Sequence, residues 1–173
     1  MITLIGWLVG TYLLASISSA VLWSRCFGHP DPRGSGSRNP GATNVLRVGG
    51  KAAAALTLLS DGLKGALPVW LSQKAGMVEW QSHLVAFGAV LGHAFPLFFR
   101  FRGGKGVATA AGCLLVLTPS LAGIALLVWL LAIAFSQRSA YASMFAAAVL
   151  AITMPWWLPT THWGLMALPL FVL

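Results

Sequence analysis

The chain has 173 residues, of which 58% are hydrophobic and only 8% are charged. Since a soluble domain is usually about a quarter charged, this composition excludes one and requires an outer surface that faces hydrocarbon. A net charge of +8 would suggest nucleic acid in a soluble protein, but membrane proteins gather Lys and Arg in cytoplasmic loops, so no nucleic-acid partner is expected.

Apolar stretches follow one another along the whole chain. In order they are Met1–Trp23, Ala52–Leu71, Trp80–Phe99, Val107–Leu117, Ser120–Phe135, Tyr141–Leu158 and Trp163–Leu173. A spanning helix needs about 20 mostly apolar residues. The first stretch is too long for a signal-peptide core and follows no basic residue, so we expect it to be a spanning helix. The sequence predicts an all-α, polytopic membrane bundle of five to seven transmembrane helices, forming one domain over residues 1–173.

The polar segments between these stretches predict the orientation. Alternating crossings place Arg25–Lys51, Arg100–Gly106 and Gln137–Arg138 on one face. That face holds most of the basic residues: Arg25, Arg33, Arg38, Arg47, Lys51, Arg100, Arg102, Lys105 and Arg138. The positive-inside rule makes this face cytoplasmic and places the N-terminus outside.

The first loop carries the residue types of an anion site. Its core reads Gly36-Ser37-Arg38-Asn39-Pro40-Gly41-Ala42-Thr43-Asn44-Val45-Leu46-Arg47. Glycines let backbone N–H groups converge on an anion, and Ser, Thr and Asn add neutral donors. Thr43 is a candidate helix cap, and Arg47, four residues later, would share its helix face. The alternative is an ordinary turn followed by a cap.

The second loop, Gly103-Gly104-Lys105-Gly106, surrounds one lysine with three glycines. No side chain would block a ligand from the backbone amides, and Lys105 would supply a point charge. The spacing is not that of a Walker loop, and the alternative is a flexible turn with a lysine of the positive-inside kind.

Polar residues also occur within the apolar stretches. Asp61 and Lys64 are three residues apart, so on a helix they would pair, either structurally or as part of a site. His93 is either a candidate site residue or a satisfied interfacial histidine. Ser139 and Ser143 are either site hydroxyls or helix-packing serines. We find no metal-ligand pattern and expect no cofactor. Together these features predict a phosphate-binding pocket at the cytosolic leaflet.

Several long motifs in order resemble the bacterial acyl-phosphate:glycerol-3-phosphate acyltransferases of the PlsY type. They are Asp31-Pro32-Arg33, Asn39 to Arg47, Asp61-Gly62-Leu63-Lys64-Gly65, Leu91-Gly92-His93 and Gly103 to Thr109, and the resemblance runs from Thr11 to about Pro155. It implies that a long-chain acyl phosphate donates its acyl group to the 1-hydroxyl of glycerol 3-phosphate. The implied products are lysophosphatidic acid, for phospholipid biosynthesis, and inorganic phosphate. It also implies a seven-helix protein of the bacterial inner membrane, with lipid as partner and the site at the cytoplasmic face.

The resemblance implies roles for particular residues. The implied catalytic residues are Ser37, His93 and Lys105, and either His93 or a substrate phosphate would take the hydroxyl proton. The implied substrate-binding residues are Ser37, Arg38, Asn39, Gly41, Thr43, Asn44, Arg47, Gly103, Gly104, Lys105, Gly106, Ser139 and Ser143. Asp61 and Lys64 would support the site. Oligomeric state and acyl-chain preference are not predicted.

Three departures from the family pattern bear on this expectation. Arg38 stands where glycine is common, and Ala140 stands where serine is frequent. The family usually continues into an Arg-His…Asn motif and a basic tail, whereas this sequence stops at Leu173, so the C-terminal end of the family pattern is absent from it. The alternative function is a small transporter or channel for anionic phosphorylated solutes, which would need charged groups along a path to both faces.

Overall fold

The computed structural model describes residues 2–157, with side chains from 3 to 153, and all the secondary structure of this part is helical. The helices are α1 (Ile2–Ala15), α2 (Ser19–Cys26), α3 (Ala42–Lys74), α4 (Glu79–Ala94), η1 (Leu97–Phe99), α5 (Val107–Leu117), α6 (Pro119–Ser136) and α7 (Ser139–Trp157). The all-α prediction is confirmed. The stretch Trp163–Leu173, expected to begin another helix, lies outside the described residues.

Three helical segments of the described chain are long and apolar enough to cross a bilayer, namely Thr3–Cys26, Glu79–Phe99 and Pro119–Ser136. Two further apolar helices, Val107–Leu117 and Ser139–Thr153, are shorter. Most of α6 points away from the protein, since only Leu121 of its side chains is buried. An apolar helix with so little burial is suited to a lipid surround, because lipid replaces the missing protein contacts.

The first predicted span is broken, which corrects the expectation of one continuous helix over Met1–Trp23. α1 ends at Ala15 and α2 begins at Ser19, so Ser16, Ile17 and Ser18 separate two helices. The buried Lys64 donates a hydrogen bond from Nζ to the Ile17 carbonyl oxygen at 3.1 Å. A carbonyl freed by a helix break within an apolar segment needs a donor, and α3 supplies one.

The second correction concerns the first loop, which is shorter than Arg25–Lys51. α3 begins at Ala42, so its first turns belong to what was expected to be loop. Gly50 interrupts this helix, with φ 85° and ψ 177°. A backbone with such a φ favours glycine, so Gly50 gives α3 a kink between its first turns and the longer part that follows.

Glycines bring two pairs of helices very close together. A Cβ on Gly65 would overlap the Thr109 carbonyl oxygen, and one on Gly112 would overlap that of Gly62. A Cβ on Gly92 would stand 2.8 Å from the Ala15 Cβ. α3 therefore packs backbone to backbone against α5, and α4 packs in the same way against α1, as small residues allow between membrane helices.

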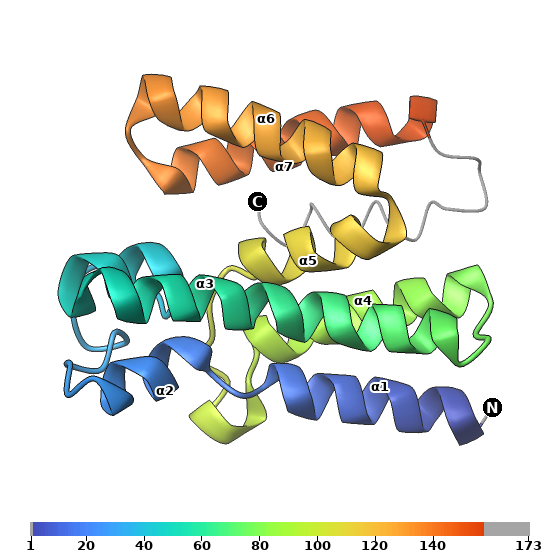
Figure 1. The fold of residues 1–173 in the computed structure, drawn as a ribbon, viewed down its shortest axis with the longest axis horizontal. Helices are drawn as coiled ribbons and strands as arrows, with labels where there is room; N and C mark the ends of the chain where they lie inside the picture. Colours follow the sequence, from blue (N-terminus) through green and yellow to red (C-terminus); the bar gives the residue numbers. More distant parts are fainter. Residues whose placement is uncertain (1, 158–173) are drawn as a thin grey trace.

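Figure 1 shows how this packing arranges the molecule. The N-terminus lies at one end, whereas the start of α3 and the turn between α6 and α7 lie at the other. α3 lies between α1 and α5, and the antiparallel pair α6 and α7 lies beyond α5. The first loop and the α6–α7 turn are consequently at the same end of the bundle.

Candidate functional site

The first loop is held in shape by the side chain of Asn44. This buried amide accepts a hydrogen bond from the Ser37 backbone N–H at 2.9 Å and donates to the carbonyl oxygens of Pro32 and Ser35 at 2.8 and 3.0 Å. Gly36 lies against it, with φ 61°, where a Cβ would overlap the Asn44 Oδ1 atom. Asn44, expected to bind substrate, here orders the loop that presents Ser37.

The start of α3 differs from the expectation for Thr43. The N-cap residue is Gly41, in an extended conformation with φ −124° and without a side-chain cap. Thr43 therefore lies within the first turn of the helix. Because the free N–H groups of a first turn favour an anion, this end of α3 keeps the phosphate-binding potential that the glycine pattern indicated.

The hydroxyl of Thr43 contacts the beginning of α7. Ser139 Oγ donates a hydrogen bond to Thr43 Oγ1 at 3.1 Å, which joins residues 96 positions apart. Ser143 lies one turn further along α7, where its hydroxyl donates to the Ser139 carbonyl oxygen and accepts from Trp129 Nε1 on α6. Ser139 thus belongs to the site end of α3, whereas the contacts of Ser143 are those of a helix-packing serine.

The second loop folds directly onto His93. The Gly104 N–H donates to the His93 carbonyl oxygen at 3.2 Å. A Cβ on Gly104 would overlap His93 Nε2, and one on Gly103 would overlap the carbonyl oxygens of His93 and Ala94. Gly106, with φ 73°, is the N-cap of α5. Three glycines are needed because the backbone meets His93 and then reverses into a helix.

Beneath this loop lies a buried row of three ionisable side chains. Lys64 Nζ is 2.9 Å from Asp61 Oδ1, and His93 Nδ1 is 3.5 Å from the same oxygen. All three side chains are at least 90% buried. The Oδ1 atom of Asp61 consequently faces both Lys64 and His93, which connects α3 to α4 and, through Gly104, to the second loop. The pairing of Asp61 with Lys64 is confirmed.

The cations predicted for the site are exposed. Arg47 lies on the first turns of α3, Lys105 lies between the glycines of the second loop, and Arg38 lies in the first loop with φ 60°. Among the described residues, the ion pairs do not involve any of these three. Ser37 is exposed and Asn39 is partly buried. Exposed guanidinium and ammonium groups beside backbone N–H donors are suited to a phosphate ligand.

Two features of this end were missed by sequence reasoning. The Asp31 carboxylate binds Arg33 in a bidentate manner, with 2.7 Å between Nη2 and Oδ2 and 3.0 Å between Nε and Oδ1. The Ile17 carbonyl, which Lys64 holds, was also missed, although Ser16 and Ser18 in an apolar stretch were a signal of the break. Within the described residues, no cluster of His, Cys, Asp or Glu could hold a metal ion.

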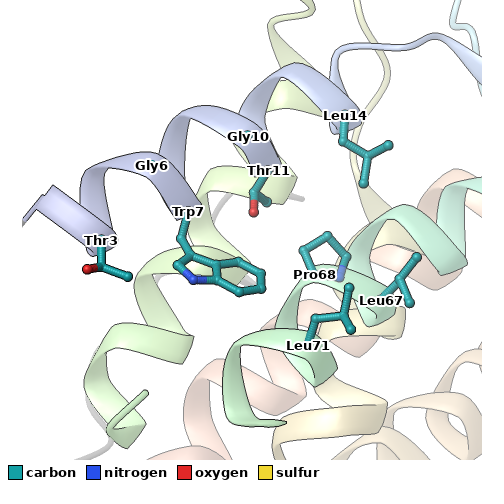
Figure 2. A pocket seen from close by; sticks show the side chains of 9 residues that line it. All are labelled: Thr3, Gly6, Trp7, Gly10, Thr11, Leu14, Leu67, Pro68 and Leu71. Carbon is teal, nitrogen blue, oxygen red and sulfur yellow. The ribbon is translucent and has the colours of Figure 1, made fainter. Parts of the chain in front are cut away.

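An apolar groove lies away from these loops, between α1 and α3. It has a volume of about 410 Å³ and is lined by Thr3, Gly6, Trp7, Gly10, Thr11, Leu14, Leu67, Pro68 and Leu71. Figure 2 shows that Trp7 and Thr11 of α1 face Pro68 and Leu71 of α3 across it. Since its lining carries no charged side chain, this groove is unsuited to a phosphate.

The sequence of this chain is similar to those of known proteins. The family profile described as glycerol-3-phosphate acyltransferase matches residues 5–173. A glycerol-3-phosphate acyltransferase of Methylobacillus flagellatus is 54% identical over 145 residues, which are 82% of this chain and 72% of the relative. Another from Pseudomonas syringae pv. tomato is 51% identical over 152 residues, 87% of this chain and 79% of the relative.

Two solved structures share the fold. A crystal structure of PlsY, an integral membrane glycerol 3-phosphate acyltransferase, in its glycerol 3-phosphate form superposes with a TM-score of 0.90 at 32% identity, covering 98% of this chain and 86% of that one. The lysophosphatidic acid form of PlsY superposes with a TM-score of 0.86 at 30% identity and the same coverage.

Proposed function

Because the chain belongs to the glycerol-3-phosphate acyltransferase family, we propose that it acylates the 1-hydroxyl of glycerol 3-phosphate with an acyl phosphate as donor. The products are lysophosphatidic acid and inorganic phosphate, and the reaction belongs to phospholipid biosynthesis. The donor's long acyl chain remains in the bilayer while the acceptor comes from water. A membrane enzyme with its polar loops gathered at one end suits such a pair of substrates.

One observation carries this proposal. Exposed basic side chains lie on or next to two glycine-containing loops, and a buried side chain holds each loop in place. Asn44 shapes the loop before Arg47, and His93 supports the loop that carries Lys105. The reaction requires two phosphates to be positioned, one on each substrate. Arg47 and Ser37 are proposed for one phosphate and Lys105 with the amides of Gly103 to Gly106 for the other. Arg38, Asn39, Gly41, Thr43 and Ser139 complete the proposed lining.

The proposed chemistry needs little beyond this positioning. The 1-hydroxyl oxygen attacks the acyl carbonyl carbon, an ester C–O bond forms, and the bond from that carbon to the phosphate oxygen breaks. Phosphate is a good leaving group, so orientation of the reactants and stabilisation of the developing oxyanion are the main requirements. The hydroxyl proton goes to the departing phosphate, which leaves as inorganic phosphate.

The geometry favours a positioning role for His93 in place of the alternative role as general base. Its Nδ1 atom faces Asp61, and its Nε2 atom lies against Gly104. His93→Gln should therefore lower the turnover number without changing the shape of its pH profile. A pH profile of different shape in the variant would instead assign His93 the role of base.

A direct assay tests the reaction. Purified protein in detergent or vesicles should release inorganic phosphate and form lysophosphatidic acid from palmitoyl phosphate and glycerol 3-phosphate, whereas palmitoyl-CoA should not replace the donor. The transporter alternative is tested by uptake of labelled glycerol 3-phosphate into liposomes without donor. Uptake without acyl transfer would overturn the proposed enzyme.

The location is proposed to be the bacterial inner membrane, with the loops of the site in the cytoplasm and the N-terminus outside. The support is the excess of basic residues in the three loops, together with the position of the N-terminus at the opposite end of the bundle (Figure 1).

A further inference from the structure

A second polar cavity lies beside the first loop. It has a volume of about 650 Å³ and is formed by the end of α2, the segment from Asp31 to Gly34, η1 and the turn that follows η1. We call it the arginine cavity, because its lining includes Arg25, Arg33, Arg100 and Arg102. Ser37, Arg47, His93 and Lys105 of the proposed substrate site do not line it.

The charge in this cavity is strongly unbalanced. Asp31 is the one acidic residue of the lining, and Arg33 binds it in a bidentate manner. The guanidinium of Arg33 also lies 5.2 Å from the centre of the Phe99 ring. The hydrogen bonds from Arg33 hold the pKa of Asp31 below its usual value, so this carboxylate stays ionised at neutral pH. The charges of Arg25, Arg100 and Arg102 then remain uncompensated by the lining.

The backbone after η1 is shaped to bring two of these arginines to the cavity. Arg100 and Phe101 both have positive φ, 55° and 57°. Two successive non-glycine residues in the left-handed region are uncommon and cost free energy. The turn is held by hydrogen bonds from the Phe101 N–H to the Pro96 carbonyl oxygen and from the Arg102 N–H to that of Phe99. A simple positive-inside signal would need no such turn, since charge alone satisfies that rule.

The surroundings of the cavity are apolar and exposed. Phe98 belongs to the lining and is 58% exposed, and Phe101, between the two arginines, is 56% exposed. Leu97 at the start of η1 is also exposed. Large apolar side chains next to arginines are suited to the membrane interface, where the rings enter the acyl region and the guanidinium groups meet phosphates.

We propose that the arginine cavity binds the phosphate headgroup of an anionic phospholipid from the surrounding leaflet, at a site separate from that of the substrates. Guanidinium groups converging from two segments match a phosphate by charge-assisted, bidentate hydrogen bonds. The exposed phenylalanines favour a phosphate that carries acyl chains over a free one. Arg102 directly precedes Gly103, so a bound headgroup would also steady the loop that carries Lys105.

The test is lipid binding by purified, delipidated protein, and it requires no catalytic activity. Native mass spectrometry would titrate phosphatidylglycerol, with phosphatidylcholine, whose zwitterionic headgroup has no net charge, as the reference. Arg25→Gln and Arg102→Gln each remove one exposed guanidinium from a different wall of the cavity. Lys51→Gln is the matched control, because it removes one exposed positive charge of α3 outside the cavity.

The expected result is retention of phosphatidylglycerol by the wild-type and Lys51→Gln proteins, and binding weaker by about tenfold or more in each arginine variant. Equal weakening in all three variants would overturn the proposal in favour of diffuse attraction, and unchanged binding in the arginine variants would overturn it outright. Displacement of the lipid by millimolar inorganic phosphate would instead assign the cavity to a soluble phosphate. Equal unfolding temperatures for the variants would exclude misfolding as the cause.

Discussion

The second loop can lie on His93 because residue 104 is a glycine and has no Cβ atom. A Cβ there would overlap His93 Nε2, a ring nitrogen that cannot withdraw freely because Nδ1 faces Asp61 at 3.5 Å. Gly104 is therefore needed for the loop to pack against His93, as well as for a ligand to reach the loop. This physical reason adds to the one that the sequence suggested, which was access of a phosphate to the backbone amides.

The first prediction follows for Gly104→Ala. Overpacking typically costs about 1–3 kcal/mol, so we expect kcat/KM to fall roughly 5- to 150-fold as the loop shifts away from His93. Gly123→Ala is the control, because a Cβ at that position of α6 would meet no atom within 4 Å. Steady-state kinetics of both variants give the measurement. Equal activity of the two would show that the loop adapts without consequence.

Lys105 presents the opposite situation, since its side chain is exposed and packs into no core. Lys105→Ala should leave the unfolding temperature unchanged. Losing one charge-assisted contact to phosphate costs about 1.5–3 kcal/mol, or roughly one to two decades of rate. Lys51→Ala, also exposed, should retain full activity. Wild-type turnover in Lys105→Ala would remove Lys105 from the proposed site.

At the scale of elements, α3 connects the other parts of the molecule. It presents Arg47 near its start, carries Asp61 and Lys64 further along, and packs through Gly62 and Gly65 onto α5. Its buried lysine bonds the break between α1 and α2, and its buried aspartate faces α4. A charged pair inside a bundle is expensive to bury, but here Lys64 also satisfies the Ile17 carbonyl oxygen at the break between α1 and α2.

The third prediction concerns this pair. Lys64→Met should destabilise the protein by about 3–5 kcal/mol, because it leaves the Asp61 carboxylate without its ammonium partner and the Ile17 carbonyl without a donor. The double variant Asp61→Asn with Lys64→Met should recover part of this loss, since no unpaired buried charge remains. Equilibrium unfolding in detergent measures both variants. A double variant less stable than Lys64→Met would contradict the interpretation.

At the scale of the whole molecule, the loops of the proposed site can act together only if they lie on one side of the membrane. The start of α3 and the α6–α7 turn lie at one end of the bundle, opposite to the N-terminus (Figure 1). The hydrogen bond between Ser139 and Thr43 joins these two parts directly. Sidedness relative to the cell then depends on the basic residues of the loops.

The fourth prediction tests that sidedness by cysteine labelling in a Cys26→Ser background, in which the remaining Cys113 is buried. Cysteines placed at Gly34, Arg102 and Gln137, all exposed, should react only after the membrane is opened to a reagent that cannot cross it. A cysteine at Ala75, in the turn after α3, should react in intact cells. Labelling of any of the first three from outside would separate the loops and overturn the proposed site.

Local composition was sufficient for much of this architecture. The stretch expected over Val107–Leu117 has the same bounds as α5. The expected stretches Ser120–Phe135 and Tyr141–Leu158 begin within two residues of the starts of α6 and α7. Apolar runs between polar turns determine such helices, because backbone groups in lipid must bond within the segment. The glycine and basic motifs likewise indicated a phosphate site and a family before any coordinates, and the family is confirmed.

Long-range contacts decided the rest. The break at Ile17 is stabilised by Lys64, 47 residues away, and the role of Asn44 in shaping the first loop depends on carbonyls up to 12 residues before it. The arginine cavity brings together residues of α2, the first loop and the turn after η1. The sequence alone indicated only that these arginines mark the cytoplasmic face. Composition determines which segments enter the membrane. Which buried donor meets which freed acceptor, and which cations converge, depends on the packing of helices distant in sequence.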